Sequence, residues 1–238
     1  MGILDFLFGG SKESQLKRHS KRVSNLNAQA EDREASAMWL AEEGSEASIF
    51  AMLKRFSLNY EQRMKDTKEK EKIYRLLENL GTTALEPSKE WMRRNVNFAY
   101  PLKLVQKLEG DEGCVLFLLE LLSLENDDFT PQKKIQILSH LQNYAHPKIV
   151  EVLPPYLSDF NEDVRYAVIE TLIAQEDDAI RAPFLNHLAN PKEVSNRLKH
   201  RIASHFVDKD WSTSGAPDDL KESLPVGFTL ADDRIVES

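Results

Sequence analysis

The chain has few of the residues that mark β-rich or disulfide-bonded proteins. Its 238 residues include 9 glycines, 10 prolines and a single cysteine, against 41% hydrophobic residues. Together with the scarcity of strand-like alternation, this composition predicts a mostly helical protein. The lone Cys114 excludes an intramolecular disulfide and predicts a packing residue rather than a nucleophile. Folding is therefore not expected to need an oxidising compartment.

Long apolar segments are also missing. The longest apolar run, residues 114–122, is interrupted by Glu120 and is too short to span a bilayer. The opening residues, MGILDFLFGG, have no basic region ahead of their apolar ones, so we expect no cleavable signal peptide. These features predict a cytoplasmic protein.

Motifs that mark metal sites and common catalytic centres are not found. The six histidines form no ligand pattern with cysteine or carboxylates at the usual spacings. A glycine-rich phosphate loop, a nucleophile elbow and a kinase signature are missing as well. We therefore predict no catalytic, cofactor-binding or metal-binding residues, and a protein that is not an enzyme.

The charge of the chain is acidic and unevenly distributed. The formal net charge is -8, from 39 acidic and 31 basic residues, so non-specific binding of nucleic acid is not expected. Residues 11–22 carry five bases and one acid, whereas residues 208–238 carry eight acids and three bases. Poles of opposite sign favour oriented association with a partner.

What the chain contains instead is a helical template that recurs. The strongest copy lies in Asn161 to Ala189, which predicts two antiparallel helices joined by a short acidic turn. A helix pair this small cannot cover its own apolar faces, so it requires similar pairs on both sides. Its first helix combines apolar residues at helical spacing with one cation: Val164, Arg165, Ala167, Val168, Ile169 and Leu172.

Weaker copies of the template flank this pair. They recur about 31 residues earlier and about 34 residues later, both usual repeat periods, and a distant copy lies near the start of the chain. The earlier copy contains Lys134, Ile137, Leu138 and Leu141, the later one contains Leu198, Lys199, Ile202, Ala203 and Phe206, and the distant one contains Arg33, Ala35, Ala37 and Leu40.

Residues 157–172, LSDFNEDVRYAVIETL, resemble the HEAT family, particularly the short bacterial repeats of the PBS-lyase type. The resemblance implies an all-α fold, a right-handed α–α superhelix in which HEAT-like helix pairs stack into a solenoid. Residues 61–108 depart from the pattern because they lack the Asp-Val-Arg signature and carry a charged insertion. The matching residues are Leu157, Asp159, Asp163, Val164, Arg165, Ala167, Ile169 and Leu172.

Three segments follow from this resemblance. Residues 1–28 are expected to form an apolar tip and a basic capping helix, residues 29–207 the repeat domain, and residues 208–238 an acidic tail or cap. We expect Leu4, Phe6, Leu7 and Phe8 to cover the exposed face of the first repeat. The alternative is peripheral membrane contact through Met1 to Arg22, because an apolar tip followed by cations suits an anionic surface.

Several local signals predict where helices begin and end. Gly44 and Gly81 are expected to end helices, and Ser45 to cap the helix that follows it. The charged run at residues 61–72 is predicted to lengthen a solvated helix, and Pro154 with Pro155 to break another. Near the C-terminus, Phe228, Leu230, Ile235 and Val236 either form a hairpin around Asp232 and Asp233 or lie across the last repeat, the simpler arrangement.

The resemblance implies a non-catalytic protein–protein interaction scaffold that uses the concave face of a solenoid. Candidate partner-binding residues are four cations expected to receive an acidic segment of another protein: Lys54, Arg55, Arg93 and Arg94. Lys68 and Lys72 mark the opposite, convex surface as the alternative. Arg165 is expected to be structural, binding Asp159, Asp163 or a neighbouring repeat.

Two enzyme alternatives come from the same resemblance. HEAT-like DNA glycosylases are small helical-repeat proteins that act on damaged bases, and they need a cationic, aromatic-lined face. Trp39, Trp91 and Trp211 are the candidate aromatics, although packing between repeats is the favoured role for Trp91. A bilin lyase is the third alternative and rests on the repeat resemblance alone.

Overall fold

The computed structural model describes residues 11–125 and 130–238, and 70% of it is helix. The expected mostly helical class is therefore confirmed. The chain divides into two compact units, which we call unit 1 (Met1–Cys114) and unit 2 (Val115–Ser238). The domain boundaries expected after residues 28 and 207 stay predictions, and the two roles considered for the apolar tip at residues 1–10 lie outside the described residues.

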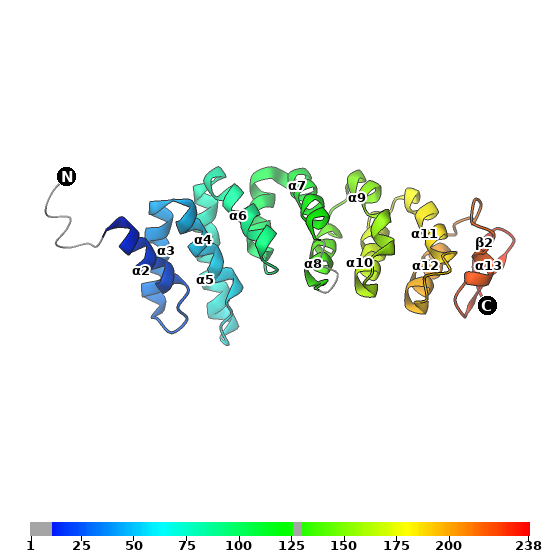
Figure 1. The fold of residues 1–238 in the computed structure, drawn as a ribbon, viewed down its shortest axis with the longest axis horizontal. Coiled ribbons are helices and arrows are strands. Elements are labelled where there is room, and N and C mark those ends of the chain that lie inside the picture. The colour runs from blue at the N-terminus through cyan, green and yellow to red at the C-terminus, as the bar shows by residue number, and fades with distance from the viewer. Residues whose placement is uncertain (1–10, 126–129) are drawn as a thin grey trace. The chain divides into compact units, whose positions relative to one another are not determined.

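The described part of unit 1, residues 11–114, is built of helices, and α3 packs against α2, α4 and α5 (Figure 1). Their bounds are α2 Lys12–Val23, α3 Ala30–Glu43, α4 Glu46–Lys54, η1 Arg55–Ser57, α5 Arg63–Leu80 and α6 Thr82–Arg94. Helix α7 (Ala99–Leu124) follows, has non-helical backbone at Gly110, and carries the chain from unit 1 into unit 2.

The predicted boundaries in unit 1 are confirmed. Gly44 ends α3 with a φ of 65°, in the left-handed region where a side chain would be strained. The hydroxyl of Ser45 then accepts a hydrogen bond from the Ser48 N–H and caps α4. The charged run at residues 61–72 forms most of the first part of α5, and Gly81 ends that helix.

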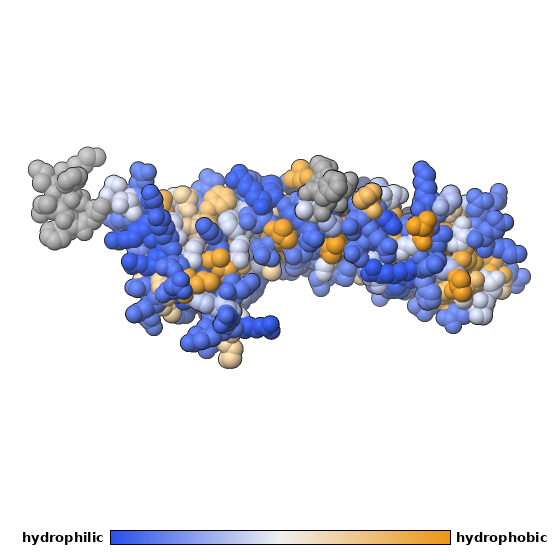
Figure 2. All heavy atoms as spheres, turned by 60° about the horizontal axis from the view of Figure 1, so that its bottom comes forward, coloured by the Kyte–Doolittle hydropathy of each residue, from blue (hydrophilic) through white to orange (hydrophobic). Residues whose placement is uncertain are grey.

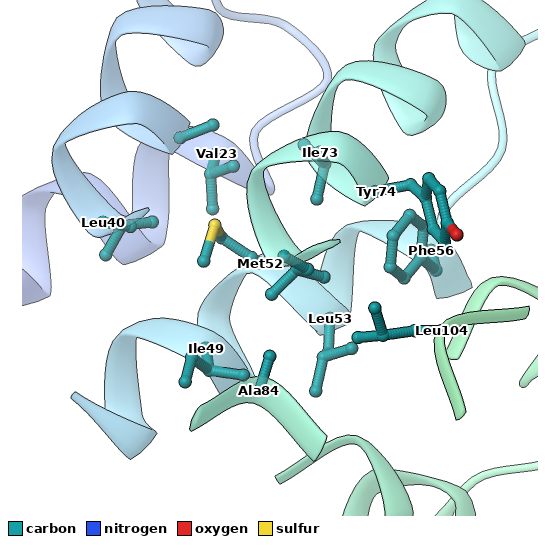
Figure 3. Packing of buried hydrophobic residues seen from close by; sticks show 12 residues of the cluster. Val23, Leu40, Ile49, Met52, Leu53, Phe56, Ile73, Tyr74, Ala84 and Leu104 are labelled. Atoms are coloured by element: carbon teal, nitrogen blue, oxygen red, sulfur yellow. The ribbon is translucent and has the colours of Figure 1, made fainter. Parts of the chain in front are cut away.

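The core of unit 1 draws one or more apolar side chains from each helix. Figure 3 shows Val23 of α2, Leu40 of α3 and Met52 of α4 converging, with Ile73 of α5 beside them. Further along, the ring of Phe56 stacks on Tyr100 with centroids 4.7 Å apart. This shared core fixes α3 and α5 as neighbours, which matters for the site described below.

Unit 2 has the same construction from shorter helices. After the end of α7 come α8 Gln132–Leu141, α9 Pro147–Val152, η2 Pro154–Ser158, α10 Glu162–Ile173, η3 Asp178–Ile180, α11 Arg181–Leu188, α12 Asn196–Asp208 and α13 Leu220–Ser223. The helix pair expected in Asn161 to Ala189 is present as α10 and α11. Pro154 and Pro155 break the preceding helix, as predicted, and begin the 3-10 turn η2.

The recurring template corresponds to buried positions in unit 2. Its apolar residues on α8, α10 and α12 are all inaccessible or nearly so. Neighbouring copies are also joined by hydrogen bonds, because the hydroxyl of Thr171 on α10 donates to the carbonyl of Leu138 on α8 at 3.1 Å. The amide of Gln175 donates to the Tyr144 carbonyl at 3.0 Å and accepts from the His146 N–H at 3.1 Å.

The C-terminal residues form a hairpin, one of the two arrangements considered for them. Strand β1 (Phe228–Ala231) pairs antiparallel with β2 (Arg234–Glu237), with Phe228 opposite Glu237. Asp232, in the turn, has a φ of 53°, a conformation that aspartate tolerates better than most residues. Strand β2 packs against α12, so the hairpin also covers that helix.

None of the described helices combines the length and apolar character that a membrane-crossing helix needs. Hydrophilic side chains cover most of the face drawn in Figure 2 over α2 to α5, and apolar ones appear there only in small separate patches.

Candidate functional site

The main candidate site is a groove of about 850 Å³ in unit 1, formed by α3, α5 and the loops that precede them. We call it the α3–α5 groove. Helix α3 contributes residues spaced three and four apart, which therefore form one stripe along the helix. This stripe consists of Ala30, Arg33, Glu34, Ala37 and Met38.

The opposite wall belongs to α5. Its lining residues also follow helical spacing: Lys65, Lys68, Glu69, Lys72, Ile73, Arg75 and Leu76. The first half of this wall is charged and the second half mixes charge with apolar side chains. The two stripes differ in sign, since α3 presents one exposed acid to the groove while α5 presents four exposed cations.

A buried ion network forms the floor of the groove. The guanidinium of Arg33 on α3 binds the carboxylate of Glu69 on α5 at two points, Nε–Oε1 3.0 Å and Nη2–Oε2 2.8 Å. Glu69 Oε1 also accepts from Nε of Arg55 at 2.8 Å. Arg55 Nη2 in turn donates to Asp66 Oδ1 at 2.6 Å, and Lys70 reaches the other oxygen of Asp66 at 2.8 Å. Every buried charge here has a partner, as burial requires.

Tyr60 connects this ion network to the loops before α3 and α5. Its ring centroid lies 4.9 Å from the Cζ of Arg33 and 5.0 Å from that of Arg55. Cations at this distance from a tyrosine ring are attracted by its π face. The hydroxyl of Tyr60 donates to the Leu26 carbonyl at 3.2 Å, and Arg33 Nη1 donates to the Ala28 carbonyl. The loops before α3 and α5 are thus held together.

The network keeps its acids ionised. Burial alone would raise the pKa of Glu69, but hydrogen bonds from Arg33 and Arg55 outweigh it and hold the pKa below its ordinary value. Burial likewise opposes ionisation of Asp66, and hydrogen bonds from Lys70 and Arg55 lower its pKa overall. The floor is therefore a fixed arrangement of paired charges at neutral pH, a rigid base rather than a reactive centre.

The rim of the groove carries cations that the network does not use. Lys72 bonds Glu34 across the groove at 2.6 Å. By contrast, Lys65, Lys68 and Arg75 are exposed and form no ion pair with any residue that the structure describes. Of the acids at helical spacing from these cations, Glu69 binds Arg33 and Glu71 binds Lys103. Glu61 remains as an exposed acid of the lining, so the cations outnumber the acids available to them.

Apolar side chains lie beside these cations. Met38 is 51% exposed, and Leu76 of α5 is partly exposed. Ala37 and Ile73 are buried but line the groove from below. An exposed methionine over small and aliphatic side chains is a surface that adapts to an apolar partner.

The four cations predicted to bind a partner do not form this site. Lys54 is exposed on α4, while Arg93 and Arg94 on α6 pair with Glu90 at 3.4 Å and 2.5 Å. The prediction for Arg55 is wrong, because its side chain is 0% exposed and is held by Asp66 and Glu69. It belongs to the 3-10 turn η1, which directs the guanidinium under Tyr60 instead of into solvent.

The spacing of residues along α5 could have predicted the buried ion network. Asp66 and Lys70 each lie two helical turns before a core residue, Ile73 and Leu77, and so belong to the buried stripe of α5. Extending that stripe back into the run at residues 61–72 assigns these charges to the interior. The cations at positions 65, 68 and 72 then fall on the groove side.

The residues predicted to be structural make a related arrangement in unit 2. Arg165 binds Glu193 at two points, Nε–Oε2 2.8 Å and Nη2–Oε1 3.2 Å, and donates from Nη1 to the Asp159 carbonyl at 2.9 Å. The carboxylates of Asp159 and Asp163 do not hold Arg165; they bind Lys134 at 2.9 Å and Arg197 at 3.0 Å instead. Arg165 therefore joins its own loop to the segment before α12.

The three tryptophans pack within the units. Trp39 stacks on His19 with ring centroids 4.5 Å apart, Trp91 lies 6.3 Å from Phe50, and Trp211 meets His205 edge-on at 5.0 Å. None of the three is among the residues that line the groove.

Within residues 11–125 and 130–238, no cluster of three or more histidine, cysteine, aspartate or glutamate side chains has the geometry to hold a metal ion. Comparisons with protein-family models, with curated proteins and with solved structures found no match to this chain. The α3–α5 groove is therefore interpreted from its own geometry.

Proposed function

We propose that the chain is a non-catalytic interaction module that binds another protein in the α3–α5 groove. The observation that carries this proposal is that one groove combines exposed or partly exposed apolar side chains with cations that lack ion-pair partners among the described residues. Met38 and Leu76 supply the apolar part, and Lys65, Lys68 and Arg75 the charged part. Apolar centres flanked by charges are typical of protein interfaces.

The floor of the groove favours binding because it is already ordered. Arg33, Glu69 and Tyr60 hold α3, α5 and both preceding loops through bonds that need no partner. A preformed site loses less conformational freedom when it binds, and more of the contact energy then appears as affinity. The network thus has a structural role that supports recognition.

The proposal retains a HEAT-like solenoid as the arrangement of the helix pairs. Supporting it, Arg33 and Arg165 occupy the same position of the recurring template and make equivalent bonds in the two units. The interaction surface differs from the concave face expected from the sequence, since it uses α3 and α5 rather than the α4 and α6 cations. A cytoplasmic location stays part of the proposal, in keeping with the buried Cys114 thiol, which forms no disulfide.

Site-specific photocrosslinking tests this function. The photoreactive amino acid p-benzoylphenylalanine replaces Met38 in the groove or, as the control, Val96, which is 41% exposed and does not line the groove. In a lysate of the native cells, position 38 should capture a discrete protein that position 96 does not. The captured protein, once purified, should bind the full chain directly and lose affinity for the Met38→Glu variant.

Either of two results would refute the proposal. One is that positions 38 and 96 capture the same proteins in the same amounts. The other is that the purified protein captured at position 38 binds the Met38→Glu variant as tightly as the unmodified chain.

A further inference from the structure

The charge of the α3–α5 groove is opposite to that of the whole chain. The chain has a formal net charge of -8. After Arg33 pairs with Glu69 and Lys72 with Glu34, the lining retains Lys65, Lys68 and Arg75 against Glu61. A cationic wall with few acids beside it attracts a negatively charged partner.

Each wall of the groove is one face of a helix, α3 on one side and α5 on the other. Small residues on α3, Ala30 and Ala37, leave room for close approach of a third helix against the groove. The lined part of α5, from Lys65 to Leu76, is about 16 Å long at a rise of about 1.5 Å per residue. About three turns of a partner helix fit along that length.

An amphipathic helix can contact the apolar part and the charged part of the groove at the same time. A helix seated over Ala37, Met38 and Ile73 places its apolar stripe on the floor side of the groove, while one flank faces the cations of α5. Helices that bind in grooves use apolar anchors at i, i+3, i+4 and i+7 in this way. Acidic residues on the facing flank would pair with Lys65, Lys68 and Arg75.

We infer that the α3–α5 groove receives an acidic amphipathic α-helix of about three turns from a partner protein. This inference rests on the proposed function and specifies the chemistry of the partner. An extended peptide is a poorer fit, since the walls offer no open strand edge for it to pair with. A nucleic acid would pair with the cations, but it would leave the exposed Met38 and the aliphatic side chains beside it without an apolar contact.

Peptide display reveals which sequences the groove prefers, because random peptides compete for it on equal terms. A library of random peptides about 14 residues long, long enough for three to four helical turns, is selected against the full chain. It is selected in parallel against the variant Lys65→Glu/Lys68→Glu/Arg75→Glu. The matched control is Lys17→Glu/Lys54→Glu/Lys107→Glu, which reverses three exposed cations of unit 1 that do not line the groove.

The unmodified chain and the control should enrich peptides with acidic residues beside an apolar stripe of helical spacing. The groove variant should enrich basic residues beside the same stripe, because the sign of its wall is reversed. An acidic peptide selected on the unmodified chain should bind the groove variant about tenfold more weakly, measured by fluorescence anisotropy, and the control within about twofold. Should the glutamate variant unfold, the Lys65→Gln/Lys68→Gln/Arg75→Gln variant removes the charge of the wall without reversing it. It should lose the acidic preference and bind the acidic peptide more weakly than the control does.

Any one of the following results would overturn the inference. Peptides selected on the chain show no acidic preference, or circular dichroism shows that they bind without forming a helix. Alternatively, a peptide of sequence MGILDFLFGG or a single-stranded oligonucleotide displaces them from the groove more effectively than an acidic helix does. If a protein crosslinks at position 38 through a basic or extended segment, the inference fails while the proposed function stands.

Discussion

Arg33 and Arg165 make equivalent bonds in two different units of the chain. Each guanidinium binds a carbonyl in the loop before its own helix, at Ala28 and Asp159 respectively. Each also binds a later carboxylate at two points, Glu69 for Arg33 and Glu193 for Arg165. At both positions the arginine therefore links the loop before its own helix to a segment later in the chain.

The first prediction concerns Glu69, the acid shared by two arginines. Glu69→Gln removes the carboxylate that pairs with Arg33, whose side chain is only 6% exposed. We expect the free energy of unfolding to fall by about 3 kcal/mol, since an unpaired buried charge is costly. Glu34→Gln, the same change in an exposed ion pair, should cost about 0–1 kcal/mol. Urea unfolding at neutral pH measures both, and equal losses would mean that the network is not structurally coupled.

A second prediction concerns the corresponding residue of unit 2. Arg165→Met should lower the melting temperature, because it frees the Asp159 carbonyl and leaves the buried Glu193 without its arginine. Arg197→Met is the comparison, because Arg197 is half-exposed and bonds the exposed Asp163. Thermal unfolding followed by circular dichroism should show a clear decrease for the first variant and little change for the second. An unchanged melting temperature for Arg165→Met, with loss of partner binding, would make Arg165 a recognition residue instead.

The helical fold was readable from the sequence because its signals are local. Gly44, Ser45 and Gly81 determine helix ends through their own backbone and side-chain chemistry. The buried apolar positions of α10 follow from spacing within one helix. Such features do not depend on which segments meet in space.

The site was less predictable because it depends on contacts between distant segments. Arg55 resembles a surface cation when only its neighbours are considered, yet Asp66 and Glu69 of the next helix bury it. Likewise, Lys65 and Lys68 have acids at helical spacing along the sequence. Only the structure shows that Glu69 binds Arg33 and Arg55, that Glu71 binds Lys103, and that neither lysine has an ion-pair partner among the described residues.

The third prediction concerns the dependence of stability on pH. An ion pair with Lys12, together with hydrogen bonds from Ser45 and Ser48, lowers the pKa of Glu43 from 4.5 to about 2. This carboxylate joins α2, α3 and the start of α4. Because the folded pKa lies below the unfolded one, the stabilisation is complete above about pH 4.5 and is lost as the pH falls toward 2.

Glu43→Gln should remove that part of the acid sensitivity. The unmodified chain should lose more free energy of unfolding than the variant does between pH 6 and pH 3, because over this range the carboxylate takes up a proton in the unfolded chain but stays largely ionised in the folded one. Glu42→Gln changes the exposed neighbouring acid and serves as the control. Parallel pH profiles for the unmodified chain and Glu43→Gln, measured by urea unfolding, would show that Glu43 does not contribute.

The most direct test of the central claim is a methyl NMR titration of the full chain with an acidic helical peptide from the display selection. If the α3–α5 groove is the binding site, the methyl resonances of Met38, Ile73 and Leu76 should shift first and most strongly. Reversal of Lys65, Lys68 and Arg75 should abolish these shifts at the same peptide concentration. Shifts confined to residues near Lys54, Arg93 and Arg94, or to unit 2, would contradict the account.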